Sequence, residues 1–190
     1  IAQLVIAHNA PEKGTGWHYH EADFHIVLML RGWAGAFRGQ ADVALVLVGS
    51  GSLRDPLQAL ATELGIAEQV IFAGPTKTVE RFLAIADVGL LTSRAEGLSN
   101  TLLEYMASGL PVIGSRVSGT EDFVVDGRTG WLFPAGDVAQ FRQCLERAGR
   151  LSATELRQLG LQARHLVTAD ASNAAVIGRL IELYDTGRRS

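Results

Sequence analysis

Short apolar runs alternate with amphipathic stretches through the middle of the chain, and this alternation constrains the fold more than any other feature. The run VALVLVG, residues 43–49, is apolar throughout, as expected of a strand buried on both faces of a sheet. Further strands are predicted at residues 69–74, 87–93, 111–115 and 130–134, the last as a short edge strand that Pro134 ends. Strands at this spacing, with helices between them, predict an α/β fold: a Rossmann-like parallel sheet flanked by helices.

The segments between and after these strands have helical patterns. Helices are predicted at residues 55–64, 78–86 and 98–108, and again near the end of the chain at residues 171–184. Asp137 is the expected N-cap of a helix that follows Pro134, and Ser152 with Glu155 forms the capping box of the next. The opening run at residues 3–8 is predicted as one more strand. Since no linker or repeat interrupts the pattern, residues 1–190 are predicted to form a single domain.

Composition narrows the class of function. The formal net charge is -3 and the pI is near 6.0, which argues against non-specific binding of nucleic acid. Cys144 is the only cysteine, so no internal disulfide can form, and a reducing, cytoplasmic setting fits. No apolar run has the length of a membrane span. A cytoplasmic location is predicted, with peripheral contact at the inner face of the membrane left open.

Ligands of open α/β sheets bind outside the carboxyl ends of the strands. The loops that follow His8, Gly49, Gly74 and Ser93 are therefore the candidate binding loops. Gly49 and Gly51 would let the backbone come close to a ligand. The same glycines are explained equally well by the geometry of a strand-to-helix turn.

Two glutamates, Glu96 and Glu104, flank a predicted helix start. The first N–H groups of a helix lack internal partners and its dipole favours anions there, and Ser99, Asn100 and Thr101 can all bind phosphate oxygens. Glu104 lies about a turn inside the helix, where a carboxylate can accept both hydroxyls of a ribose. Taken alone, the pair is explained as well by a favoured helix N-terminus and a solvated face.

The order of the motifs resembles the C-terminal, donor-binding domain of family 4 (group 1) retaining glycosyltransferases of the GT-B fold. The resemblance covers nearly all of residues 43–168 and rests on E-x7-E followed by A-x-G-x-P-V, G-x-x-E and D-G-x-x-G. It implies a nucleoside-diphosphate sugar donor, such as a UDP-sugar, and retaining hexosyl transfer in polysaccharide biosynthesis. The acceptor, a glycan or lipid-linked glycan, would be held by an N-terminal domain that this chain lacks. The isolated domain is expected to turn over little, and to need no metal or other cofactor.

The resemblance also implies residue roles. Glu96 would contact the transferred sugar and Glu104 the ribose, while Phe72 and Gly74 would border the base. The distal phosphate would be bound by the helix start, at Gly97, Leu98, Ser99, Asn100 and Thr101. Gly119 and Glu121 resemble positions near the donor, although Glu121 could equally cap a helix. Asp126 and Gly127 resemble a structural turn.

The chain departs from the family's pattern after its first predicted strand. His8 stands where the family has an arginine, and Ala7 where it has a glycine, whereas Lys13 is kept five positions further on. A neutral histidine offers one donor in place of the bidentate fork of arginine. His8 is predicted as a diphosphate contact, and Lys13 joins Glu96 as a predicted catalytic residue.

Residues 14–32 form an atypical histidine-rich segment. Apolar residues at helical spacing predict a helix within residues 24–37, as the family has there. His18, His20 and His25 also resemble, weakly, the first metal-binding motif of cupins. Neither a strand nor a helix would bring all three imidazoles together, and no second motif follows, so no metal site is predicted.

Two other function classes stay open. One is a nucleotide-sugar epimerase or phosphorylase of the same fold, which a catalytic base from the missing half would distinguish. The other is a non-catalytic module that binds a nucleotide sugar or, through the histidines, a metal.

Overall fold

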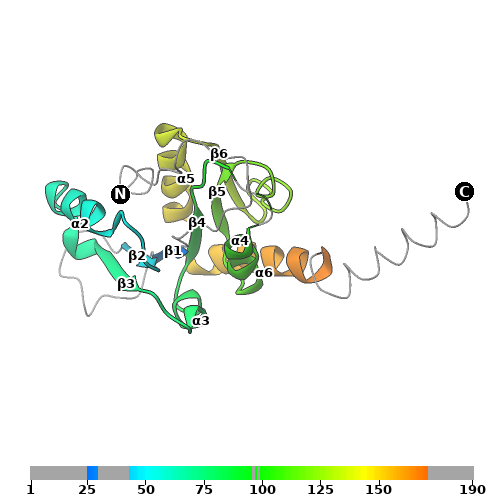
Figure 1. Cartoon of the computed structure of the whole chain (residues 1–190). Coiled ribbons are helices and arrows are strands. Elements are labelled where there is room, and N and C mark those ends of the chain that lie inside the picture. Colours follow the sequence, from blue (N-terminus) through cyan, green and yellow to red (C-terminus); the bar gives the residue numbers. More distant parts are fainter. Residues whose placement is uncertain (1–24, 30–42, 96, 98, 171–190) are drawn as a thin grey trace, which may run out of the picture.

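Among the residues that the structure describes, five strands of the sheet run in one direction and one central strand runs against them. The computed structural model describes residues 25–29, 43–95, 97 and 99–170. In these residues the sheet has the order β3-β2-β1-β4-β5-β6 (Figure 1). The strands are β1 His25–Met29, β2 Ala44–Val48, β3 Val70–Gly74, β4 Val88–Leu91, β5 Val112–Arg116 and β6 Gly130–Pro134. β1 pairs antiparallel with both β2 and β4, and all other pairs are parallel. The carboxyl ends of β2 to β6 therefore meet at one edge.

Helices connect the strands much as the sequence predicts. They are α2 Arg54–Glu63, the 3-10 helix η1 Ala67–Gln69, α3 Val79–Leu83, α4 Asn100–Ala107, α5 Val138–Arg150 and α6 Ala153–Asp170. α3 is shorter than the predicted helix at residues 78–86. Both predicted caps are confirmed: Gln140 N–H donates to Asp137 Oδ1 over 2.9 Å, and Glu155 N–H donates to Ser152 Oγ over 3.2 Å.

The segment around β1 corrects the prediction. Residues 25–29 were expected within a helix, but they form a strand whose five residues pair with Ala44–Val48 of β2. A short apolar run such as HIVLM fits either structure, and periodicity alone does not separate them. Two neighbouring strands offer backbone partners to such a run, so it joins the sheet, which is consequently not wholly parallel. The predicted strand at residues 3–8 and helix at residues 171–184 lie outside the described residues.

The core has two layers, one on each face of the sheet. Alternate residues of β2 point to opposite layers, Leu45 and Leu47 to the layer that contains α2 and α5, and Val46 to the layer that contains α3 and α4. α6 contributes to both layers. Every residue of β2 is buried, which confirms the prediction of a strand covered on both faces.

Close packing fixes α4, the helix that borders the carboxyl edge. A methyl group on Gly89 of β4 would lie 2.4 Å from Cδ2 of Tyr105, so glycine is required for this buried ring to lie on the strand. The helix ends at Ala107, and Gly109, just after its C-cap, has a left-handed φ of 78°. α6 crosses there, since a methyl group on Gly160 would lie 1.8 Å from the carbonyl oxygen of Gly109. Within the described part of the chain, no helix combines the length and apolar character needed to cross a membrane.

Candidate functional site

The loops after β2 and β3 meet at the carboxyl edge. The N–H of Gly49 donates to the carbonyl oxygen of Gly74 over 2.9 Å, and Gly51 accepts from the N–H of Arg54 over 3.2 Å. Gly74 is buried and has a left-handed φ of 74°, so a side chain there would be strained. The predicted residues Gly49, Gly51 and Gly74 thus form one corner, which we call the β2–β3 corner together with Phe72.

The loop after β4 leads directly into α4. Ser99 is 7% exposed and is the N-cap, its Oγ accepting from the N–H of Leu102 over 3.4 Å. Its hydroxyl already satisfies one of the donors of the first turn, so the structure gives Ser99 a capping role beside the predicted phosphate contact. Asn100 and Glu104 are exposed and Thr101 is half-buried. Gly97, also exposed, immediately precedes this helix start.

The loop after β5 is tied to the loop after β4. The Ser115 hydroxyl donates to the carbonyl oxygen of Ser93, so the two loops are held side by side. Gly119 is buried in the turn that follows. Glu121 lies with a carboxylate oxygen 3.7 Å from Arg116 Nη1, and both side chains are about half exposed. The carboxylate therefore contacts a cation of the same edge.

Each of the four segments at the carboxyl ends of β2 to β5 carries a cation: Arg54, Lys77, Arg94 and Arg116. α2, α3 and α4 all begin at this edge, so their N-terminal dipoles add to the positive potential. The same segments also carry the carboxylates Asp55, Glu80 and Glu121, so the side chains of the edge are of both signs, and it is the helix N-termini that favour an anionic ligand there.

The predicted catalytic residues Glu96 and Lys13 lie outside the described residues, as do His8 and Leu98. Their roles stay predictions. The same holds for the metal prediction, since His18 and His20 also lie outside them. In the described part, no three His, Cys, Asp or Glu side chains group as metal ligands would.

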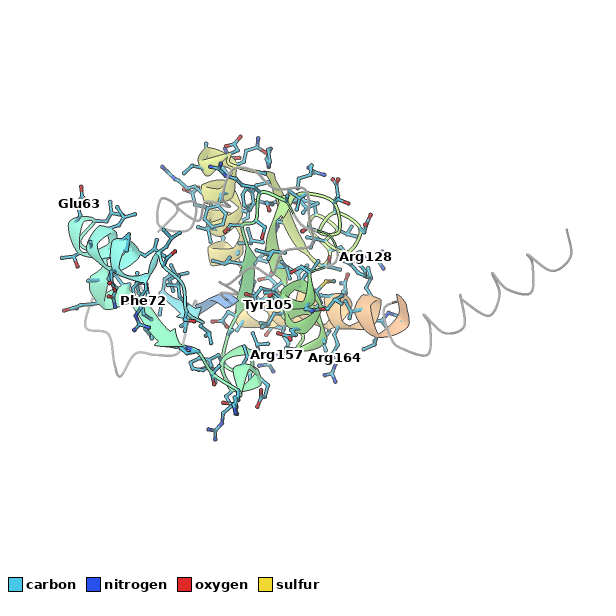
Figure 2. All side chains as sticks on the ribbon, viewed as in Figure 1. Glu63, Phe72, Tyr105, Arg128, Arg157 and Arg164 are labelled. Carbon is cyan, nitrogen blue, oxygen red and sulfur yellow. The ribbon has the colours of Figure 1, made fainter. Side chains whose placement is uncertain are left out.

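Arg54 is a candidate that the sequence analysis missed. It is the first residue of α2, and its Nη2 donates to the carbonyl oxygen of Phe72 over 3.4 Å. Its guanidinium carbon lies 5.9 Å from the centre of the Phe72 ring. Figure 2 labels Phe72 on the α2 side of the sheet, apart from Tyr105 of α4. The available signal was an arginine three residues after the glycine of a strand-to-helix turn.

Asp126 and Gly127 form the predicted structural turn. Asp126 Oδ1 accepts from the N–H of Leu132 in the edge strand β6 over 3.4 Å, and Gly127 N–H donates to the carbonyl oxygen of Gly130 over 2.8 Å. Arg147 of α5 approaches both carboxylate oxygens of Asp126, at 3.4 and 3.2 Å. These contacts cover the open side of β6 and lie away from the carboxyl edge.

Comparison with known proteins agrees with this architecture. The family model described as glycosyl transferases group 1 matches residues 16–149. The chain belongs to this family. The match begins inside the histidine-rich segment, so the family's pattern takes in most of it.

Individual relatives of the family match the chain over much of its length. It is 40% identical over 105 residues to the lipopolysaccharide core biosynthesis glycosyltransferase LpsE of Rhizobium meliloti, covering 55% of this chain and 31% of that protein. It is 32% identical over 173 residues to the GDP-mannose-dependent alpha-(1-6)-phosphatidylinositol monomannoside mannosyltransferase of Mycolicibacterium smegmatis, covering 85% and 44%. The structure superimposes on sucrose-phosphate synthase from Thermosynechococcus elongatus with a TM-score of 0.65 and 27% identity, covering 74% and 37%. The chain therefore spans less than half the length of these relatives.

Proposed function

We propose that this chain is the donor-binding half of a retaining, nucleotide-sugar-dependent hexosyltransferase. The observation that carries the proposal is the carboxyl edge, where the β2–β3 corner and the N-terminus of α4 follow parallel strands of one sheet. This is where α/β sheets bind nucleotides, and the N-terminus of α4 suits a diphosphate. Membership of the group 1 glycosyltransferases supports the sugar-transfer chemistry.

We infer the residue roles partly from this arrangement and partly from the family resemblance. The start of α4 would bind the distal phosphate, with Gly97, Asn100 and Thr101 beside it, while Glu104 would accept the ribose hydroxyls. Glu96 would contact the transferred sugar, and His8 and Lys13 would stabilise the departing diphosphate, as the resemblance implies. Catalysis would then come from positioning the donor and stabilising the leaving group, without a required metal.

The acceptor would be a glycan or a lipid-linked glycan held by a second half. The relatives named for lipopolysaccharide core biosynthesis and for mannosyl transfer to phosphatidylinositol monomannoside support such an acceptor. Because the acceptor half is expected on a separate part of the protein, the chain alone should bind donor weakly and turn over little. A cytoplasmic location and peripheral membrane contact stay predictions.

Calorimetry of the full 190-residue chain with a nucleoside diphosphate tests the proposal. Glu104→Ala should weaken binding by about 1.5–3 kcal/mol, because a charged hydrogen bond to the ribose is lost. A 2′-deoxyribose analogue should lose affinity against the unmodified chain and show little further loss in the variant. Glu63→Ala, an exposed change at the far end of α2, is the matched control and should leave affinity unchanged.

Two different negative results would bear on two different parts of the proposal, the role of Glu104 and donor binding itself. Equal affinity of the unmodified chain and Glu104→Ala would remove Glu104 from the ribose site. Absence of binding to any nucleoside diphosphate would reject the donor-binding role as a whole.

A further inference from the structure

Arg54 lies at the β2–β3 corner, where its guanidinium makes two contacts with Phe72. Nη2 bonds the Phe72 carbonyl oxygen, the guanidinium lies over the Phe72 ring, and a methyl group on Gly74 would lie 3.7 Å from Nη1. The side chain is half-buried. It therefore covers the segment from Phe72 to Gly74 in a defined place rather than extending into solvent.

The positive charge of Arg54 has no carboxylate within ion-pair distance among the described residues. Its hydrogen bond to the Phe72 carbonyl oxygen uses one Nη2–H, whereas a guanidinium has five N–H donors. Leaving most of these donors without protein acceptors at a half-buried position costs free energy unless another acceptor or water meets them. A ligand with exposed oxygen acceptors would meet this requirement.

The position of Arg54 indicates which part of a nucleotide it meets. Its contacts are to β3, and the helix start proposed to bind phosphate follows β4, three strands away in the order β3-β2-β1-β4. At about 4.8 Å for each strand spacing, the two lie roughly 14 Å apart. An extended nucleoside diphosphate whose phosphates lie at α4 would bring its base, rather than its phosphates, to the β2–β3 corner.

We propose that Arg54 is a specificity-determining residue that selects bases carrying an exocyclic carbonyl oxygen, an inference that rests on the proposed donor-binding function. A guanidinium only donates hydrogen bonds. Guanine O6 and uracil O4 are carbonyl acceptors, whereas adenine carries the amino donor N6 at that position and keeps only its ring nitrogens as acceptors. Arg54 thus favours a uridine or guanosine diphosphate and disfavours adenosine diphosphate.

Calorimetry of the full chain with UDP, GDP and ADP tests this selection. We expect the unmodified chain to bind UDP or GDP at least about 10-fold more tightly than ADP, as one charged hydrogen bond provides. Arg54→Met keeps an unbranched apolar stem but removes every donor. It should weaken the preferred nucleotide about 10-fold and leave ADP within about twofold, so that the preference disappears. Arg54→Lys keeps the charge without the planar fork and should keep part of the preference.

Arg147→Met is the matched control, because Arg147 also lies 5.9 Å from an aromatic ring, that of Trp131, but away from the carboxyl edge. It should keep the base preference.

A uniform loss for all three nucleotides in Arg54→Met would indicate general attraction to phosphate and overturn the proposal. An unchanged preference in Arg54→Met, or a preference of the unmodified chain for ADP, would also overturn it. If Arg54→Met does not fold, an unaltered preference in Arg54→Lys overturns it in the same way. Binding of none of the three nucleotides would reject the proposed function, and this inference with it.

Discussion

Arg54 and Arg147 each hold a guanidinium carbon 5.9 Å from the centre of an aromatic ring, yet the two flanks of the sheet use this contact differently. On the β6 flank, Arg147 pairs with Asp126, whose carboxylate also accepts from the N–H of Leu132 in the edge strand. On the β3 flank, Arg54 bonds only a backbone carbonyl among the described residues. The first arrangement closes an edge of the sheet, and the second leaves donors available at the edge where a ligand is expected.

The difference shows that an arginine over an aromatic ring does not by itself mark a binding site. What separates the two is the partner of the remaining donors and the edge of the sheet on which the pair lies. The β6 flank has the features of protected strand edges, whose open N–H groups must find partners. The β3 flank has the features of a ligand corner, with glycines at close approach and unneutralised charge.

The largest expected effect is on the free energy of unfolding, and it differs between Trp131 and Phe72, the two rings that the arginines contact. Trp131 is 3% exposed, so Trp131→Ala should lower the free energy of unfolding by about 3–5 kcal/mol through lost burial and a cavity. Phe72 is only half-buried, so Phe72→Ala should cost roughly half as much. Urea unfolding followed by circular dichroism measures both. Equal losses would mean that the β2–β3 corner is as much a part of the core as the β6 flank, and the comparison would fail.

A smaller change in the free energy of unfolding is expected when the contacts of the two arginines are removed, and it should differ between them. Asp126→Ala should lower the free energy of unfolding by about 1 kcal/mol, since the ion pair is half exposed and the carboxylate also holds the N–H of Leu132. Added salt should reduce this difference, because exposed charges are screened. Arg54→Met removes no ion pair among the described residues and should change stability less. The same urea series at low and high salt checks this, with Glu63→Ala as an exposed control. If Arg54→Met were the more destabilising change, Arg54 would have mainly a structural role.

Much of the fold could be predicted because the signals are local. The edge strand Gly130–Pro134 was predicted to the residue, since its apolar run ends in a proline that cannot continue a ladder. Asp137 and Ser152 were recognised as caps because each side chain acts within three residues of itself. The helix prediction for the segment that forms β1 was wrong for the opposite reason. Its five residues, four of them apolar, fit a helix or a strand, and the partners that decide between the two, β2 and β4, are distant in sequence.

The residues of the candidate site show the same contrast between local signals and contacts that join distant parts of the chain. Gly49 and Gly74 were predicted because each ends a recognisable strand, but the bond between them exists only because β2 and β3 are parallel neighbours. Arg54 was missed because its contact with Phe72 joins residues 18 positions apart. The capping bond of Ser99 to Leu102 is local, but the burial of Ser99 depends on tertiary packing, which no pattern within the helix reveals. The sequence thus locates the loops of the candidate site, and tertiary packing decides which of their polar groups already have a partner within the protein.

The smallest predicted effect uses Cys144 as a reporter of the β6 flank. This thiol is buried beneath the flank, with Sγ 3.9 Å from the carbonyl oxygen of Leu132. Burial raises the pKa of Cys144 above its ordinary value of 9.0, while the nearby charge of Arg147 opposes the rise and that of Asp126 adds to it. Because the folded chain holds the proton more tightly, the associated stability is fully present below the unfolded thiol's pKa. It is lost as the pH rises through the folded pKa.

Unfolding of the reduced protein between about pH 8 and about pH 10 should therefore show a slightly larger loss of stability than unfolding of Cys144→Ala over the same range. Alkylation by iodoacetamide gives a second readout, because only the exposed thiolate reacts. Asp126→Ala should speed alkylation of the otherwise intact chain by loosening the cover of β6, whereas Arg54→Met, on the other flank, should leave the rate unchanged. Acceleration by both changes would show that the two flanks open together, and the distinction between a closed edge and a ligand corner would not extend to their dynamics.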